Sequence, residues 1–157
     1  MSGAGAPKTG SIDGRGLNVV VIAGTWHETI SDGLIAGAQR VLDEAHATSR
    51  VVRVPGSFEL AVAAQAAFAG GADAVVALGV IIRGGTPHFE YVSSAATDGL
   101  TRVSLDAGKP VGFGLLTLDD EQQGLDRAGL EGSKEDKGAE AADAALRTAL
   151  VIRELRG

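Results

Sequence analysis

The stretch that decides the fold is ALGVIIRGGTPHFEY, residues Ala77–Tyr91. An apolar run over Val75–Ile82 is typical of a strand that is covered on both faces. Two glycines follow it and lead to Thr86 and Pro87, a good N-cap and a good first helical residue. The sequence therefore predicts a buried strand, a tight turn and a helix that starts at Thr86.

The start of this helix has the features of an anion site. Gly84 and Gly85 would let a ligand come close to the backbone, and the first helical turn offers free N–H groups and the positive end of the helix dipole. His88 follows directly, and imidazole is the side chain that titrates near neutral pH. Phosphate binding beside an imidazole predicts proton transfer on a phosphorylated small molecule, although His88 could instead be structural.

Length and composition are typical of a compact enzyme subunit. A chain of 157 residues is expected to form one domain that buries about two thirds of its unfolded surface. Apolar residues make up 45% but aromatic residues only 4%, so Ala, Val, Leu and Ile must build the core. The 23 glycines gather where apolar runs end, which predicts tight strand-to-helix turns. The absence of cysteine excludes disulfides and thiolate chemistry.

Charge and hydropathy limit the partners. A net charge of -6 argues against nucleic acid or an anionic membrane as the general partner, although a local basic pocket stays possible. No apolar run is as long as a membrane span, and the first residues, MSGAGAPKTG, lack the regions of a signal peptide. We therefore expect a cytoplasmic protein.

Strands and helices alternate along the chain. Residues 1–16 are Gly-rich, and we expect them to be flexible or docked on a neighbour, which leaves 17–157 as the domain. Apolar runs predict strands at 17–23, 51–54, 75–82 and 110–116. Helix starts are predicted at Thr25 with Glu28, at Ser57, at Thr86, at Thr117 with Asp120, and at Ser133. This alternation predicts an α/β fold of three layers, αβα, around a four-stranded parallel sheet.

Ligands of such sheets bind beyond the carboxyl ends of the strands, at the point where the strand order reverses. The unusual residue groups of the chain all fall at predicted strand ends. These groups are Trp26–His27, Gly56–Glu59, Gly84–His88 and the turn after Phe113. Topology alone therefore predicts one site at this edge.

Several of these side chains allow two interpretations. Trp26 could stack on a flat heterocycle or plug the core, and Phe113 could be a core residue or the wall of a ring pocket. Glu59 could bind ligand hydroxyls together with Ser57, or could be a charge that the helix dipole favours. Taken alone, Arg127 has a ready structural role in the last turn of a short helix.

The other two histidines are weaker candidates. His27 could take part in catalysis, but its position does not require it. We expect His46, in DEAHATSR, to lie on a solvated helix end.

Five stretches taken together, in this order and spacing, resemble lumazine synthase, the penultimate enzyme of riboflavin biosynthesis. They are VPGSFEL (54–60), ALGVIIRGGTPHFEYV (77–92), LTRVSLDAGKPVGFGLLT (100–117), DRAG (126–129) and EDKGAEAA (135–142). The resemblance covers about residues 17 to 155. It implies a flavodoxin-like fold and the condensation of 5-amino-6-(ribitylamino)uracil with 3,4-dihydroxy-2-butanone 4-phosphate, which releases phosphate and water. It implies no cofactor and no metal.

The resemblance also implies roles in binding the uracil substrate. Trp26 would stack on the pyrimidine ring, and Phe113 would form another wall. The ribityl chain would be held by Ser57, Phe58 and Glu59. The pyrimidine pocket would be lined by the backbone of Val80, Ile81 and Ile82.

For the second substrate the resemblance implies an anion site. Gly85 and Thr86 would receive the phosphate, and Arg127 would reach over from a neighbouring subunit to complete the site by a bidentate contact. His88 would move protons during imine formation and phosphate loss. Lys137 is a further possible site residue.

Three positions depart from the family pattern. Leu118 stands where Thr is usual, Gly124 where Ala is usual, and His27 where many members have Asn. We expect Gly124 to weaken the helix that carries Arg127 by roughly 0.5 to 1 kcal/mol.

Two other functions stay open at this point. An archaeal-type riboflavin synthase would share the fold but need no phosphate site, which Gly85, Thr86 and Arg127 argue against. A nonenzymatic carrier of flavin or lumazine would use Trp26 for stacking and leave His88 without a role.

The resemblance further implies a homo-oligomer with active sites between subunits. A lone subunit would expose the small-residue face of Ala141, Ala145 and Ala149, so a closed ring is expected. The turn at 129–134 is about two residues longer than in the members of the family that form sixty-subunit shells. We therefore expect a ring of five subunits and no shell.

Overall fold

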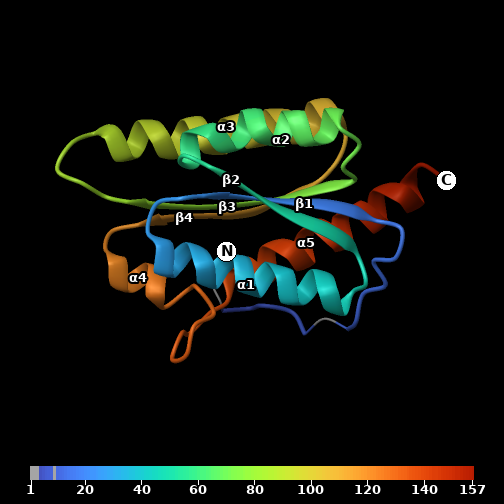
Figure 1. The fold of residues 1–157 in the computed structure, drawn as a ribbon, viewed down its shortest axis with the longest axis horizontal. Helices are drawn as coiled ribbons and strands as arrows, with labels where there is room; N and C mark the ends of the chain where they lie inside the picture. Colours follow the sequence, from blue (N-terminus) through green and yellow to red (C-terminus); the bar gives the residue numbers. More distant parts are fainter. Residues whose placement is uncertain (1–3, 9) are drawn as a thin grey trace.

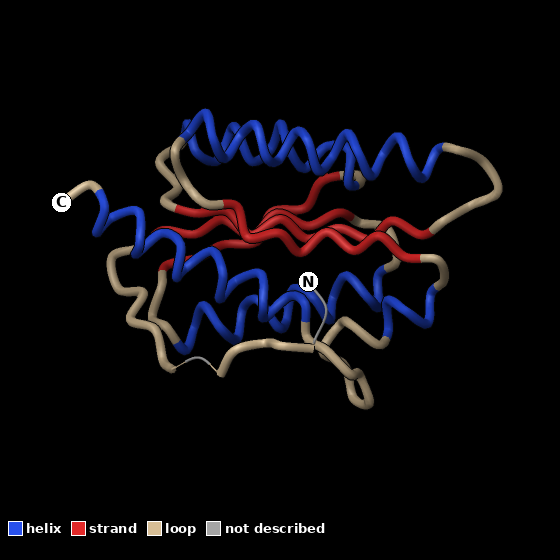
Figure 2. The backbone as a smooth tube through the Cα atoms, turned by 180° about the vertical axis from the view of Figure 1, so that it is seen from behind, coloured by secondary structure: helices blue, strands red, loops and turns tan. Residues whose placement is uncertain are grey.

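The structure, a computed structural model, describes residues 4–8 and 10–157. A parallel sheet lies between two layers of helices (Figures 1 and 2). The strands are β1 (Asn18–Gly24), β2 (Thr48–Val54), β3 (Ala74–Ile82) and β4 (Val111–Leu118). The helices are α1 (Glu28–Glu44), the 3-10 helix η1 (Ser57–Glu59), α2 (Leu60–Ala69), α3 (His88–Ala107), α4 (Glu121–Leu125) and α5 (Lys137–Leu155).

The strand order is β2-β1-β3-β4, and all three pairings are parallel. The predicted three-layer fold with a four-stranded parallel sheet is confirmed, and the order fits the flavodoxin-like arrangement. The chain moves outward from β1 to β2, then crosses back over β1 to β3. The reversal point therefore lies between the carboxyl ends of β1 and β3.

Two hydrophobic cores lie on the two faces of the sheet. Alternate residues of β1 enter them, because successive side chains of a strand point to opposite faces. Val19 and Val21 join the core under α1 and α5, whereas Val20 and Ile22 join the core under α2 and α3. The sequence of β1 is apolar throughout because both of its faces are covered.

The expectation that a small-residue face of the last helix is exposed was wrong. Ala141, Ala145 and Ala149 are 3%, 1% and 7% exposed and pack in the core beneath the sheet. A Cβ on Gly112 of β4 would overlap the carbonyl oxygen of Ala141, and one on Gly138 would overlap that of Leu34. These two glycines lie inside a strand and a helix and allow close packing there. The sequence had predicted glycines in turns and missed this role.

The predicted starts of the first two helices, α1 and α2, are wrong. Thr25 and Glu28 form no capping box, because the Thr25 hydroxyl donates to Pro55 O and α1 begins at Glu28. Ser57 does not cap an α-helix but begins η1, and α2 follows from Leu60. At Thr25 a tertiary hydrogen bond replaces the local one.

The last two helices begin later than predicted, each behind an aspartate. Asp120 accepts from Gln123 N (2.9 Å) and caps α4, which is only five residues long. Asp136 accepts from Ala139 N (3.1 Å) and caps α5. Ser133 instead lies in the turn between them, where its hydroxyl donates to Leu125 O.

Part of the N-terminal segment contacts the domain. Ile12 packs against the core under α1 and α5, and Gly14 N donates to Ala45 O (2.7 Å). Residues 1–3 and 9 lie outside the described part of the chain, and the domain boundary at residue 17 stays a prediction. Within the described ranges, no helix combines the length and the hydropathy that crossing a membrane requires.

Candidate active site

The loops after β1 and β2 are fixed against each other at the carboxyl edge of the sheet. Both the backbone N–H (3.4 Å) and the hydroxyl (2.8 Å) of Thr25 donate to Pro55 O. The carbonyl of Gly24, at the end of β1, accepts from Arg53 Nη2 (3.0 Å) and Ser31 Oγ (3.0 Å). The residues that follow Thr25 therefore stand on a rigid base.

Trp26 is 68% exposed, so it does not plug the core of this chain. Its indole lies on Gly56: a Cβ there would be 3.4 Å from Cδ1 and Nε1. The same Cβ would be 3.5 Å from Glu59 Oε2, which places the carboxylate beside the indole. A flat apolar face next to a carboxylate suits a heterocycle that carries hydroxyl groups.

His27 adopts the left-handed conformation, with φ 57° and ψ 67°, as the N-cap of α1. Its side chain makes no capping hydrogen bond, and its ring centroid is 6.5 Å from that of Trp26. Asn, Asp and His are enriched among the non-glycine residues that adopt this conformation. The exchange of the more usual Asn for His therefore preserves the backbone turn behind Trp26.

Ser57 is directed toward the middle of the sheet, and only 8% of the residue is exposed. A Cβ on Gly79 of β3 would lie 2.5 Å from Ser57 Oγ, so the bare glycine makes the room for the hydroxyl. Phe58, the next residue, is 63% exposed. Trp26, Gly56, Ser57 and Gly79 thus form a series of neighbours that leads from the exposed first loop to the buried backbone of β3.

The two neighbours of β3 pair with it over different lengths. Its pairing with β1 ends at Ala23 and Leu78, whereas its pairing with β4 continues to Ile82 and Leu118. Within the part of the chain that the structure describes, Val80, Ile81 and Ile82 therefore have no strand partner on the β1 side, and the side chains of Val80 and Ile81 are buried in the two cores. Backbone groups at such an edge are free to bind a ligand.

Arg83 holds the loop between β3 and α3 in place. Its N–H donates to Leu118 O (2.8 Å), and its guanidinium pairs with Asp119 (3.0 Å) and more distantly with Glu90 (3.9 Å). The guanidinium carbon also lies 4.5 Å from the centre of the Phe89 ring. The loop is thereby tied to the end of β4.

The expected anion site lies in the exposed loop just after Arg83. A Cβ on Gly84 or Gly85 would meet nothing within 4 Å, so the backbone is open to a ligand. The helix begins at His88, later than predicted, but Thr86 Oγ1 still accepts from His88 N (3.4 Å). His88 is exposed at the first turn.

The sequence predicted Phe113 beside the end of a strand, and this prediction is wrong. Because β4 continues to Leu118, Phe113 pairs with Ala77, five residues before the end of the strand. At about 3.3 Å per residue it stands roughly 16 Å from the carboxyl edge. Half of its surface is exposed, so it is no core residue of its own chain.

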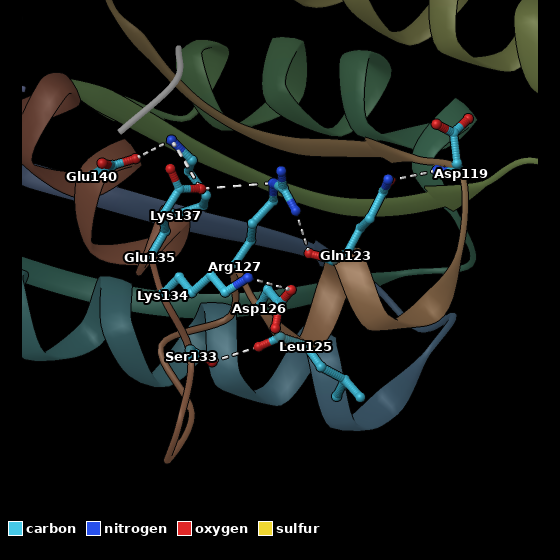
Figure 3. Close-up of polar contacts among 10 residues, drawn as sticks. All are labelled: Asp119, Gln123, Leu125, Asp126, Arg127, Ser133, Lys134, Glu135, Lys137 and Glu140. Atoms are coloured by element: carbon cyan, nitrogen blue, oxygen red, sulfur yellow. Dashed lines mark hydrogen bonds and ion pairs between the residues drawn. The ribbon is translucent and has the colours of Figure 1, made fainter. Parts of the chain in front are cut away.

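Arg127 lies in the connection between α4 and α5, in the helix layer opposite to α3 (Figures 1 and 3). Its Nη1 donates to Gln123 O (2.9 Å), and its Nε is 3.7 Å from Glu135 Oε2. Lys137 lies close by, with its Nζ 3.8 Å from the same Glu135 oxygen and 2.7 Å from Glu140 Oε2. This cluster and His88 belong to different faces of the sheet.

A family model described as 6,7-dimethyl-8-ribityllumazine synthase matches residues 16–153. The chain belongs to this family. Proteins named 6,7-dimethyl-8-ribityllumazine synthase are similar to it over its whole length: that of Leifsonia xyli subsp. xyli is 73% identical over 100% of both chains, and that of Clavibacter michiganensis subsp. michiganensis is 71% identical over 100% of this chain and 99% of the relative. That of Streptomyces avermitilis is 55% identical over 99% and 97%.

As a lumazine synthase family member, the chain is an enzyme, a transferase of riboflavin biosynthesis. Membership in this family favours lumazine synthase over the two other functions considered, an archaeal-type riboflavin synthase and a nonenzymatic carrier of flavin or lumazine. Within the described ranges, no group of three or more His, Cys, Asp or Glu side chains could hold a metal ion.

Two departures from the family pattern, Leu118 and Gly124, prove to be neighbours. A Cβ on Gly124 would lie 2.9 Å from Leu118 Cδ1 and 2.5 Å from Ile30 Cδ1, both in the buried core. The side chains of Ile30 and Leu118 therefore together take up the space that Ala would use at 124. The expected weakening of α4 by glycine is offset by this packing, because Ala would force the two side chains to shift.

Sequence reasoning missed several residues that shape the site. Gly79 was part of an apolar run, where a glycine inside a strand often marks a close approach. Arg83 lies in the stretch ALGVIIRGGTPHFEY, but its role in holding the loop after β3 was not predicted. Glu135 gave no signal, since its two cationic partners are set by the folded chain.

We predict that His27→Asn leaves kcat within about twofold of the original, because Asn also tolerates the left-handed conformation. His27→Val should lower the free energy of unfolding by about 1 to 2 kcal/mol, since a β-branched residue is strained there. Steady-state kinetics and thermal denaturation of both variants check this. A large loss of kcat in a stable Asn variant would instead give the His27 imidazole a role in catalysis.

Proposed function

We propose that this chain condenses 5-amino-6-(ribitylamino)uracil with 3,4-dihydroxy-2-butanone 4-phosphate at the carboxyl edge of its sheet, between two subunits. The observation that carries the proposal is the edge of β3 beyond Leu78, which has no strand partner on the β1 side within the described residues, together with the exposed indole of Trp26 in the loop after β1. A flat ring with amide groups on its rim needs this pairing of an aromatic face with free backbone donors and acceptors.

The uracil substrate binds along the surface from Trp26 to β3. Trp26 stacks on the pyrimidine ring, and the backbone of Val80, Ile81 and Ile82 bonds to its rim. The ribityl chain lies along Ser57, Phe58 and Glu59. The carboxylate of Glu59 accepts hydrogen bonds from its hydroxyls, a role supported by its position beside the indole.

The phosphorylated ketone binds at the start of α3. Gly85 and Thr86 offer backbone N–H groups to the phosphate, and the helix dipole favours its charge. The amine of the uracil then attacks the ketone carbonyl, and water leaves as the imine forms. His88 moves protons in this step and in the loss of phosphate, and much of the rate comes from holding the two reactants together.

A second subunit completes the site. Arg127 and Lys137 lie in the connection to α5 and at its start, in the helix layer opposite to α3, which begins at His88 (Figure 1). Phe113 lies five residues before the end of β4, so one chain alone does not gather these residues. We assign these residues to the neighbouring subunit, where Arg127 and Lys137 face the phosphate and Phe113 closes the ring pocket.

An assay with both substrates tests the proposal directly. The assembled protein should generate the ultraviolet absorbance of the lumazine product together with one released phosphate per turnover. Release of phosphate without the chromophore, or no turnover with both substrates, would refute it.

His88→Ala should lower kcat by about tenfold to a hundredfold, because proton transfer is then left to solvent. The KM for the phosphorylated ketone should change far less, since backbone groups and Arg127 still hold the phosphate. Steady-state kinetics with each substrate varied in turn measure both. An unchanged kcat would move proton transfer away from His88.

Arg127→Ala should raise the KM for the phosphorylated ketone about tenfold or more, because a charge-assisted contact to phosphate is lost. The KM for the uracil should stay nearly constant. Mixed assemblies of this variant with His88→Ala should regain activity, as some sites then combine two intact halves. Equal effects on both KM values would make Arg127 structural, and mixtures without recovery would place both residues in one chain.

The proposed assembly is a ring of five subunits, in a cytoplasmic enzyme. Large side chains are exposed on the single chain, among them Tyr91 (75%) and Val62 (65%). The hydroxyl of Ser93 is buried and has no hydrogen-bond partner among the described residues; it lies in a groove of about 520 Å³ between α3 and the end of β4. An unpartnered buried hydroxyl next to an edge strand supports a neighbouring subunit at this face.

The turn at 129–134 projects from the α1 and α5 layer (Figure 1). This projection should prevent the contacts between rings that close a shell. We predict a mass near five subunits by light scattering and no hollow spheres in negative-stain images. A mass near sixty subunits in near-neutral buffer would contradict this.

A further inference from the structure

Arg127, Glu135, Lys137 and Glu140 form a cluster of charged side chains, called here the Arg127 cluster, in which one carboxylate oxygen lies between the two cations. Glu135 Oε2 is 3.7 Å from Arg127 Nε and 3.8 Å from Lys137 Nζ (Figure 3). The Glu135 side chain is 20% exposed and that of Lys137 14%, so solvent screens this pair less than at an open surface, whereas the Arg127 side chain is 38% exposed. An anion of the chain itself therefore stands where two cations meet.

Glu135 neutralises the cations without using their strongest contacts. Both of its distances exceed the range of a hydrogen bond. Among the described residues, the hydrogen bond of the Arg127 guanidinium goes to Gln123 O instead, through Nη1. Arg127 thus keeps N–H groups for a phosphate.

The cluster has no net charge while Glu135 is ionised. Arg127 and Lys137 supply two positive charges, and Glu135 and Glu140 supply two negative ones. A phosphate dianion that approaches this cluster meets attraction and repulsion of similar size.

We propose that Glu135 sets the phosphate affinity of the site as an internal competitor for Arg127 and Lys137. This rests on the proposed function, in which these two side chains face the phosphate. Bound phosphate takes the hydrogen bonds of the cations, and the repulsion by Glu135 keeps the product phosphate from binding tightly after turnover.

The alternative role for Glu135, holding the two cations in position, is already filled by other contacts. Arg127 is fixed by Gln123 O (2.9 Å), and Lys137 by the much shorter contact to Glu140 (2.7 Å). Glu135→Gln keeps the size of the side chain and removes its charge. It should leave both cations in place and free their charge for phosphate.

Calorimetric titration of the assembled protein with inorganic phosphate tests the proposal. Glu135→Gln should bind phosphate about fivefold more tightly than the original protein. Glu131→Gln is the matched control, because it removes the same charge from the exposed turn, where Glu131 makes no ion pair or hydrogen bond within the described residues. Glu135→Asp keeps the charge and should bind phosphate nearly as the original does.

Kinetics supply a readout that a structural role would not move. In Glu135→Gln the KM for the phosphorylated ketone should fall and inhibition by phosphate should strengthen, while the KM for the uracil stays constant. Weaker phosphate binding, or equal tightening in Glu131→Gln, would overturn the proposal. If Arg127→Gln binds phosphate as well as the original does, the phosphate site of the proposed function fails instead.

Discussion

Backbone-to-backbone packing at glycines fixes the helix layer on which the Arg127 cluster depends. Gly138 at the start of α5 lies against the Leu34 carbonyl of α1, and Gly33 of α1 lies against the Ala128 carbonyl. Side chains larger than hydrogen would separate these elements. The connection that carries Arg127 is therefore held directly on α1, and a core almost without aromatic residues still packs densely.

The central strands could be predicted from the sequence because burial on both faces makes them apolar throughout. The bounds of the edge strands and the starts of the helices were harder to predict. β2 begins three residues before the predicted strand. The prediction missed Thr48, Ser49 and Arg50 because they alternate between exposed and partly buried positions and form no apolar run. Helix starts failed where a side chain found a distant partner, as Thr25 did with Pro55, because capping rules consider only neighbours in the chain.

The candidate site could be predicted as a set of loops, because the carboxyl ends of parallel strands share one edge. The distances between site residues across the sheet could not be predicted from the sequence. Phe113 was grouped with the turn after the fourth strand although it lies inside that strand, five residues before its end. The position of a carboxylate between Arg127 and Lys137 depends on how the α4–α5 connection folds back. The unequal pairing lengths on the two sides of β3 likewise follow only from the register of three strands.

Trp26 is the only tryptophan of the chain, and it stands exposed on a loop that is fixed at both sides. Its intrinsic fluorescence therefore reports on one defined place in the molecule, with no background from a buried indole. Ligand stacking, solvent access and the approach of a neighbouring subunit at this edge can each be followed through its emission. The protein thus carries its own optical probe, without a label.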